Sequence, residues 1–284
     1  MTVKKLLVAG AGQMGAGIVQ VSAVAGLDVV MIDVADEFIQ RGMAGIEKSL
    51  GRMVEKGRME AAAHDAALAR ITTSTDMAAG ADADLFVEAA PEAMEIKQGL
   101  FEKAASLLRP DAIVATNTSS LSVSKLAGIV SGPERFVGIH FFNPVPAMAL
   151  VEVVRPLSAS DETIASVTEF VLACNKEPIE VKDQAGFIVN ALLFPYLNNA
   201  VRLLEGGVAT KEGIDAAMKG GCGFPMGPFA LLDLVGLDTS VAILAALHAE
   251  FAEANYAPVP LLRRMVSAGM LGRKSGAGFY QYRK

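Results

Sequence analysis

The chain has 284 residues, 52% of them hydrophobic and 20% charged, so its length predicts about two domains with packed cores and excludes general disorder. Its formal net charge is −6 without basic blocks, which argues against nucleic acid as the main partner but is compatible with a local cationic patch. No stretch approaches about 18 uncharged apolar residues, and the N-terminal apolar run ends at Gly10, so we expect a cytoplasmic protein without a membrane span or signal peptide.

The first predicted element is a strand at residues 6–9, which is apolar throughout, as in a strand buried on both faces. It is followed by a G-x-G-x-x-G motif formed by Gly10, Ala11, Gly12, Gln13, Met14 and Gly15. The first glycine of such a motif allows a tight turn, the second lets a pyrophosphate approach the backbone, and the third lets helix and strand pack closely. Helical spacing follows the motif, so the phosphates would meet the positive end of a helix. The alternative is a glycine-rich turn without a ligand.

A second predicted strand, residues 28–32, ends in Asp33. A carboxylate at this position suits the ribose hydroxyls of a dinucleotide. The same charge would repel a 2′-phosphate, and the next basic residue is Arg41. We therefore predict NAD rather than NADP as the cofactor.

Residues from about 37 to 69 are predicted to be helical and exposed. They include Arg52, Lys56 and Arg58. One interpretation of these cations is a solvated helix face, and the other is a site for an acidic ligand tail.

Two further strands are predicted at residues 85–88 and 112–116. In an open parallel sheet the ligand lies beyond the carboxyl ends of the strands. The polar residues expected at such ends are Asp33, Glu92, Asn117, Ser119 and His140. Ser119 and its neighbour Ser120 have a second interpretation, because either would suit the N-cap of a helix over residues 121–129.

His140 ends an apolar run, residues 136–139, that predicts a buried strand. A turn with proline follows, and the next apolar run, residues 149–154, carries Glu152 in its middle. A strand, a turn and a second strand would bring Glu152 back beside His140. A carboxylate bonded to one ring nitrogen fixes the tautomer and favours the imidazolium, which suits a general base. The alternative is a core histidine satisfied by a carbonyl, with Glu152 on a solvated sheet edge.

After a helix near residues 162–173 and a strand at 178–181, the composition changes and a domain boundary is predicted near Lys182. Helices are expected at residues 185–204, from an N-cap at Thr210 to 220, from an N-cap at Asp238 to 254, and from Pro260 to 269. They are apolar on more than one side, which indicates either a subunit interface or a crowded monomer core. Asn190, in the long helix, either bonds within the core or points into an interdomain cleft at a ligand.

The predicted fold class is therefore α/β: an N-terminal Rossmann-type doubly wound, mostly parallel sheet, residues 1–182, followed by an all-helical domain, residues 183–284. Cys174 and Cys222 make neither a disulfide framework nor a metal-ligand spacing. We expect two buried, reduced thiols in a reducing compartment, and no metal site.

Together these residues resemble the L-3-hydroxyacyl-CoA dehydrogenase family, in particular its single-function bacterial 3-hydroxybutyryl-CoA members. The resemblance covers nearly the full length. The residues that carry it are the glycine motif, Asn117-Thr118-Ser119-Ser120-Leu121-Ser122, His140-Phe141-Phe142-Asn143-Pro144-Val145, residues 183–192 and residues 272–280. The His140 motif is the most specific of them.

The resemblance implies that His140 is the general base, that Glu152 orients it, that Ser119 contacts the substrate oxygen and that Asn190 completes the site. The implied cofactor-binding residues are Gly10, Gly12, Gln13, Met14, Gly15, Asp33, Asn117 and Asn143, with Glu92 and Lys97 at the nicotinamide end. The CoA phosphates would meet Arg52 and Lys56, together with Arg58. One departure is Ala191, which stands where the family often has an arginine directly after the asparagine.

The implied activity is reversible interconversion of a 3-hydroxyacyl-CoA and a 3-ketoacyl-CoA with NAD, in a homodimer formed through the helical domain. One alternative is an NAD-dependent dehydrogenase of a free β-hydroxy acid, which predicts a catalytic lysine on the long helix or an arginine for the substrate carboxylate. Asn190 has no nearby lysine, which argues against the lysine version. The other alternative is a dinucleotide-binding protein without turnover, which predicts damage in the His–Glu–Ser–Asn set, and the sequence shows none.

Overall fold

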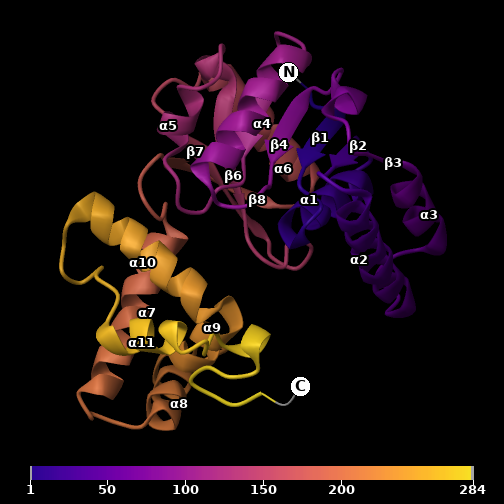
Figure 1. The fold of residues 1–284 in the computed structure, drawn as a ribbon. Helices are drawn as coiled ribbons and strands as arrows, with labels where there is room; N and C mark the ends of the chain where they lie inside the picture. The colour runs from indigo at the N-terminus through magenta and orange to yellow at the C-terminus, as the bar shows by residue number, and fades with distance from the viewer. Residues whose placement is uncertain (1, 283–284) are drawn as a thin grey trace. The chain divides into compact units, whose positions relative to one another are not determined.

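The computed structural model describes residues 2–282, which divide into two compact units between Gln184 and Ala185 (Figure 1). The predicted boundary near Lys182 lies two residues earlier. Asp183 belongs to the first unit, where its carboxylate accepts hydrogen bonds from the backbone N–H groups of Val123 (3.0 Å) and Ser124 (2.6 Å).

The first unit is built on one eight-stranded sheet with the spatial order β3-β2-β1-β4-β5-β6-β7-β8. Its strands are β1 Lys5–Ala9, β2 Asp28–Ile32, β3 Ile71–Ser74, β4 Leu85–Glu88, β5 Ile113–Thr116, β6 Phe136–Phe141, β7 Leu150–Arg155 and β8 Glu177–Lys182. Neighbouring strands pair in parallel except β6 and β7, which are antiparallel. The strand order reverses between β1 and β4, so the predicted doubly wound, mostly parallel sheet is confirmed.

The sequence pattern does not reveal strand β3. Its residues, Ile-Thr-Thr-Ser, include one apolar side chain, and Thr72 and Thr73 are exposed at the edge of the sheet. The strand forms because β2 offers a parallel partner, from the pair Val29–Ile71 to the pair Ile32–Ser74. An edge strand with little buried surface needs no continuous apolar run.

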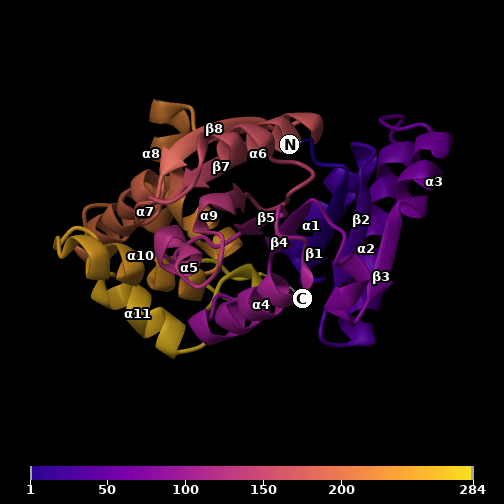
Figure 2. The ribbon, with the colours of Figure 1, turned by 90° about the horizontal axis from the view of Figure 1, so that it is seen from above.

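Helices cover both faces of this sheet, and Figure 2 shows α4 and α6 on opposite sides of the central strands. The helices are α1 Gln13–Val24, α2 Asp36–Glu55, α3 Ala61–Ala69, α4 Met94–Leu107, α5 Val123–Ala127 and α6 Asp161–Ala173. Side chains along β4 alternate between the faces: Val87 joins the core that includes residues of α1, α2 and α6, whereas Phe86 meets Phe101 of α4 edge to face. Burial on both faces explains why the central strands read as continuous apolar runs.

Helix α5 is shorter than the predicted span of residues 121–129 and has a different cap. The Ser122 hydroxyl accepts a hydrogen bond from the backbone N–H of Lys125 (3.2 Å), so Ser122 is the N-cap. The N-cap interpretation of Ser119 and Ser120 is therefore wrong, because these residues lie in the preceding turn.

The second unit is helical, with α7 Val189–Glu205, α8 Lys211–Cys222, α9 Pro228–Val235, α10 Leu237–Phe251 and α11 Pro260–Ser267. Thr210 caps α8 by accepting a hydrogen bond from the backbone N–H of Gly213 (3.1 Å), as predicted. Pro260 occupies the first turn of α11, and Gly269 follows this helix in a left-handed conformation, also as predicted.

Three expectations for this unit are corrected. Helix α7 begins at Val189 rather than 185, because Gly186 and Phe187 have positive φ values of 74° and 48°. The N-cap of α10 is Gly236, and Asp238 lies in its first turn, paired with Lys274 at 2.6 Å. Cys174 is buried, but Cys222 is exposed because it ends α8 at the surface.

Across residues 2–282 no single helix has the length and hydropathy to cross a bilayer. Helices α9 and α10 meet those criteria only when taken together, and they are bent by 96° at the break between them. Leu232 of α9 and Leu244 of α10 are completely buried in the core of the helical unit. The apolar character of this pair is thus used in packing the helical unit.

Candidate active site

The glycine motif forms the turn between β1 and α1, and its glycines meet different constraints. A Cβ on Gly10, whose φ is 111°, would lie 2.5 Å from the carbonyl oxygen of Ala89, and one on Gly15 would lie 1.7 Å from that of Gly10. A Cβ on Gly12, the N-cap of α1, would meet nothing within 4 Å. Gly10 and Gly15 are thus required by packing, whereas Gly12 leaves open space before a helix N-terminus, which fits a dinucleotide pyrophosphate.

Asp33 follows β2 and faces the same turn. Its carboxylate accepts hydrogen bonds from the backbone N–H groups of Ala11 and Val34, both at 2.7 Å. Arg41, the next basic residue along the chain, bonds within its own helix to the carbonyl of Glu37 (3.3 Å). Asp33 therefore fixes the glycine turn and places a negative charge beside it, where a ribose suits the site better than a 2′-phosphate. Of the other motif residues, Gln13 is exposed and Met14 packs against the core of this unit.

Between the glycine turn and β5, the end of β4 carries a buried ion pair. Glu88 is 0% exposed, and its carboxylate accepts hydrogen bonds from the Lys97 ammonium (2.6 Å), the Ala90 N–H (2.7 Å) and the Thr116 hydroxyl (2.7 Å). Lys97, predicted as a cofactor residue, is itself 1% exposed. Glu88 is a site residue that the sequence pattern did not identify, because a carboxylate at the end of an apolar run gives no sign of its partners.

Lys97 also pairs with Glu92 at 3.2 Å. One carboxylate oxygen of Glu92 accepts several hydrogen bonds from the turn after β5. The donors to Oε1 are the Thr118 hydroxyl at 2.6 Å, the Ser119 and Ser120 N–H groups at 2.9 and 3.0 Å, and the Ser120 and Ser119 hydroxyls at 2.9 and 3.4 Å. Burial raises the pKa of Glu92, but the Lys97 ammonium and the donors of this turn outweigh it and lower the pKa below its usual value. The residues predicted at the ends of β4 and β5 thus lie together.

The two asparagines assigned to the cofactor have different surroundings. The side-chain oxygen of Asn117 accepts a hydrogen bond from the backbone N–H of Phe141 (2.9 Å), which ties the ends of β5 and β6 together. Asn143 is exposed in the turn between β6 and β7. The Asn117 side chain therefore has a structural role at the carboxyl edge of the sheet, whereas Asn143 is exposed to solvent.

His140 and Glu152 face each other across the antiparallel pair β6–β7. They are direct partners in the strand register, and His140 Nδ1 lies 2.7 Å from Glu152 Oε2. The side chain of His140 is 7% exposed and that of Glu152 is 0% exposed. The prediction that Glu152 returns beside His140 is confirmed, and the alternative with Glu152 on a solvated edge is wrong.

The turn that joins these two strands is held by Lys176, which the sequence pattern did not single out. The buried Lys176 ammonium donates to the carbonyl oxygens of Val145 (2.7 Å), Pro146 (3.4 Å) and Met148 (2.7 Å). A Cβ on Gly17 of α1 would lie 2.7 Å from the Cβ of Val145, so the turn also packs tightly on that helix. Both contacts fix the path of the chain between His140 and Glu152.

Asn190 belongs to the helical unit, where it is the second residue of α7 and is 7% exposed. The next residue, Ala191, donates its backbone N–H to the carbonyl of Gly186 (2.9 Å). That bond closes the turn that begins the helix.

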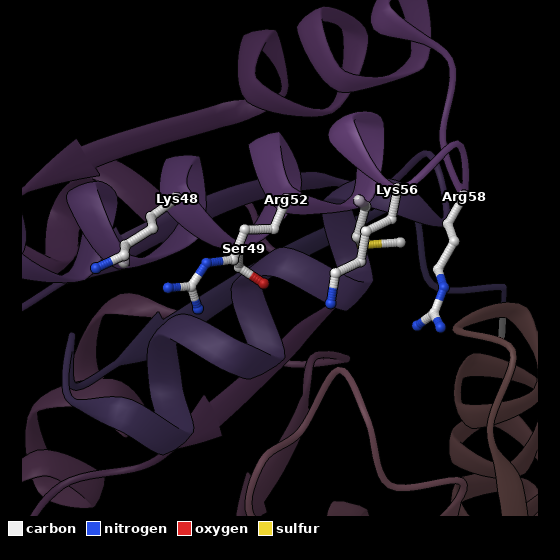
Figure 3. Close-up of a pocket in the computed structure, with 7 residues that line it drawn as sticks. Lys48, Ser49, Arg52, Lys56 and Arg58 are labelled. Atoms are coloured by element: carbon white, nitrogen blue, oxygen red, sulfur yellow. The ribbon is translucent and has the colours of Figure 1, made fainter.

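The predicted basic residues lie at the end of α2 and just after it: Arg52 is in the last turn of the helix, Lys56 is its C-cap, and Arg58 is in the following turn. Lys48, Ser49, Arg52, Lys56 and Arg58 line a cavity of about 250 Å³ together with Gly45 and Met53. Figure 3 shows the four cationic side chains extending from the helix and the following turn toward one side. This arrangement suits an anion with several charges, and Lys48 and Ser49 are lining residues that the sequence pattern did not single out.

Comparison with known proteins gives consistent matches for both units. Residues 5–184 match the family model "3-hydroxyacyl-CoA dehydrogenase, NAD binding domain", and residues 186–282 match the C-terminal domain model of the same family. A probable 3-hydroxybutyryl-CoA dehydrogenase of Deinococcus radiodurans is 48% identical over 98% of this chain and 100% of that relative. The 3-hydroxybutyryl-CoA dehydrogenase of Bradyrhizobium diazoefficiens is 46% identical over 99% of this chain and 96% of that relative. The solved (S)-3-hydroxybutyryl-CoA dehydrogenase of Ralstonia eutropha has a TM-score of 0.97 and 44% identity, with both chains covered completely.

Proposed function

Because this chain belongs to the 3-hydroxyacyl-CoA dehydrogenase family, we propose that it interconverts (S)-3-hydroxyacyl-CoA and 3-ketoacyl-CoA, with 3-hydroxybutyryl-CoA as a substrate. Its N-terminal unit is the NAD-binding domain of that family, so the predicted cofactor is NAD. The observation that carries the proposed reaction is the buried His140–Glu152 pair at the carboxyl edge of this sheet.

The described residues around the glycine turn fit NAD. Gly12 leaves space for the pyrophosphate at the start of α1, and Asp33 supplies a carboxylate for the ribose hydroxyls. When bound, NAD supplies the hydride acceptor of the oxidation. Further cofactor contacts are proposed for Gln13, Met14, Glu92, Lys97, Asn117 and Asn143.

In the oxidation direction, we assign to His140 the role of general base. Because Nδ1 bonds to Glu152, Nε2 is the nitrogen that takes the hydroxyl proton of the substrate. The negative charge of Glu152 stabilises the imidazolium that forms, and the hydrogen bond keeps the ring in one orientation. In the reverse direction the same nitrogen returns the proton.

Ser119 and Asn190 are proposed to hold the reacting oxygen and the thioester region. The Ser119 N–H bonds to Glu92 at 2.9 Å and the Ser119 hydroxyl only at 3.4 Å, so in this proposal the hydroxyl, rather than the backbone amide, meets the substrate oxygen. Asn190 would contribute a side-chain amide from the helical unit.

The cavity on α2 is proposed to bind the phosphates of CoA. Four cationic side chains around one cavity match a ligand that carries a pyrophosphate and a further phosphate. We expect Arg52→Ala or Lys56→Ala to raise KM for acetoacetyl-CoA about tenfold without lowering kcat, because the lost contact lies away from the reacting atoms.

The control for this prediction is Arg41→Ala, on the same helix but paired with Glu37. It should leave KM unchanged. Acetoacetyl-pantetheine, which lacks these phosphates, should be insensitive to all three substitutions. Equal effects on acetoacetyl-CoA and on the pantetheine ester would contradict the assignment.

The activity itself is tested by NADH oxidation with acetoacetyl-CoA and with free acetoacetate in parallel. Turnover restricted to the CoA ester supports the proposed function. Turnover with free acetoacetate alone would instead support a dehydrogenase of free β-hydroxy acids. Tight NADH binding without turnover of either substrate would support a dinucleotide-binding protein.

We also propose that the chain forms a homodimer through the helical unit, in the cytoplasm. Leu192 and Val208 are 72% and 69% exposed there, and a second copy would bury such apolar side chains. The exposed thiol of Cys222 suits a reducing compartment. Light scattering that gives the mass of one chain at micromolar concentration would overturn the dimer, and cell fractionation tests the location.

A further inference from the structure

The charges at the end of β4 form a row of three, Glu88, Lys97 and Glu92, of alternating sign. The Lys97 ammonium lies closer to Glu88, at 2.6 Å, than to Glu92, at 3.2 Å. Glu88 and Lys97 are buried, whereas the side chain of Glu92 is 35% exposed. An ammonium that is nearly removed from water gains most from the carboxylate that is also buried, so Glu88 is its principal partner.

Glu88 is itself held in place from two sides. One oxygen accepts from the Ala90 N–H as well as from Lys97, and the other accepts from the Thr116 hydroxyl on the adjacent strand β5. Glu88 and Thr116 are register partners at the ends of β4 and β5, inside a closely packed unit where side chains have little freedom to move. The Glu88 carboxylate is therefore held in one position, and its ion pair restrains the long side chain of Lys97.

Glu92 has a different role, because one of its oxygens accepts five hydrogen bonds from hydroxyl and backbone N–H groups of the Thr118–Ser120 turn. Its other oxygen faces Lys97. If the ammonium moved fully onto Glu92, it would pull the carboxylate and compete with the turn for it.

We propose that Glu88 is a positioning residue: by restraining Lys97, it leaves Glu92 able to hold the Thr118–Ser120 turn and so fixes the Ser119 hydroxyl. This inference rests on the proposed function of Ser119 at the substrate oxygen. Glu88 acts through Lys97 and Glu92 and does not itself contact the substrate.

The first test is hydrogen exchange of the backbone amides of Ser119 and Ser120, which both bond to Glu92. In Glu88→Gln, which keeps the shape of the side chain but removes its charge, we expect these amides to exchange about tenfold faster or more. The matched control is Asp84→Asn at the opposite end of β4. Asp84 accepts from the Lys4 and Lys5 N–H groups and pairs with Arg109 at 3.2 Å, so its variant should speed exchange at residues 4–5 only.

The second test is a double-substitution cycle on kcat. Glu88→Gln should lower kcat on the order of 10- to 100-fold with KM for acetoacetyl-CoA little changed, because the misplaced group acts on the reacting oxygen. In a Lys97→Met background the same substitution should change kcat by less than about threefold, because its effect requires the lysine. Asp84→Asn should leave kcat within about twofold of the wild type.

The possible outcomes are distinct. Unchanged exchange at Ser119 and Ser120 in Glu88→Gln, or an equal loss of kcat in both backgrounds, would overturn the inference and make Glu88 a core ion-pair residue only. If Glu88→Gln does not fold, Glu88→Asp, which keeps the charge but draws it back by one methylene group, must show the same effects. If the wild type lacks turnover with acetoacetyl-CoA, the proposed function fails, while the exchange experiment still decides whether Glu88 holds the turn.

Discussion

Both units bury carboxylates, but they satisfy them with different partners. In the sheet unit, Glu88 pairs with Lys97 and Glu152 pairs with His140, so each carboxylate has a partner that can carry a positive charge. In the helical unit, Asp215 and Asp233 accept hydrogen bonds from backbone N–H groups and tyrosine hydroxyls. The first kind of contact can exchange a proton or shift with a ligand, whereas the second fixes the backbone.

The helical carboxylates join segments that are distant in the sequence. Asp215 of α8 accepts from the first turn of α9 and from the Tyr280 hydroxyl, and Asp233 of α9 accepts from the Phe279 and Tyr280 N–H groups and the Tyr282 hydroxyl. Burial raises the pKa of Tyr280, and its hydrogen bond to Asp215 raises it further, so the tyrosine stays a donor. We therefore expect substitutions of His140, Glu152 or Glu88 to change the rate and substitutions of Asp215 or Asp233 to change stability.

Among the substitutions in the sheet unit, His140→Gln should cause the largest loss of kcat. Loss of a positioned general base costs on the order of 10²–10⁴ in kcat. The variant should still bind NADH, because the glycine turn and Asp33 are untouched, and it should melt close to the wild type. Steady-state kinetics and titration of NADH fluorescence measure both properties. A full rate in this variant would return His140 to the role of a satisfied strand-end residue.

Asp233→Ala should show the largest effect on the stability side. It leaves the N–H groups of Phe279 and Tyr280 without their acceptor, and an unsatisfied buried group costs about 1–3 kcal/mol. Urea unfolding should therefore show a loss of about 3 kcal/mol, with kcat per folded molecule unchanged. Asp238→Ala, which removes an exposed pair with Lys274, should cost less than about 1 kcal/mol. Equal losses of unfolding free energy in Asp233→Ala and Asp238→Ala would contradict the stabilising role assigned to the buried carboxylate.

Glu152→Gln should have an intermediate effect, visible in the dependence of rate on pH. The amide can keep a hydrogen bond to His140 but lacks the negative charge that stabilises the imidazolium formed when the ring takes the substrate proton. The acid limb of hydroxyacyl oxidation should move to lower pH, and the plateau should fall. Glu180→Gln on β8, which alters a surface pair with Arg155, should leave the profile unchanged. If the acid limb of the Glu152→Gln profile does not move, Glu152 does not take part in the proton transfer.

The effect of Glu92→Gln on stability should be small and should appear at low pH. The folded protein lowers the pKa of Glu92, so its ionised form contributes stability that is present above the unfolded value, near 4.5, and is lost as the pH falls through the folded value. Between pH 5 and pH 3 the wild type should therefore lose stability more steeply than Glu92→Gln. Urea midpoints at several pH values measure this, and parallel curves would mean that Glu92 contributes no linkage.

The sequence predicts those features whose partners are local or follow a fixed register. The glycine turn lies within one β–α unit, and the pairing of His140 with Glu152 follows from a short antiparallel hairpin. Other contacts join distant residues: Glu88 meets Thr116, 28 positions away, Lys176 meets the Val145 carbonyl, 31 away, and Tyr280 meets Asp215, 65 away. Such pairs depend on tertiary packing, which propensity and periodicity do not encode.

Helix boundaries show the same limit. The start of α7 depends on left-handed backbone at Gly186 and Phe187, and only the first of these is a residue type that signals it. The turn at Ser119 and Ser120 is set by Glu92 rather than by a helix cap, and nothing local distinguishes the two arrangements. Serine before a helix suits both.

The two edge strands of the sheet, β3 and β8, also affect whether copies of the chain can associate through their sheets. An open border offers unpaired backbone groups to any other strand, which is the route to aggregation. Strand β8 carries Pro178, which has no N–H to offer, together with the exposed charges of Glu177, Glu180 and Lys182. At the other border, β3 has only four residues, and the two in its middle are exposed threonines. Strand addition is therefore disfavoured at both borders, which limits the sheet to its eight strands.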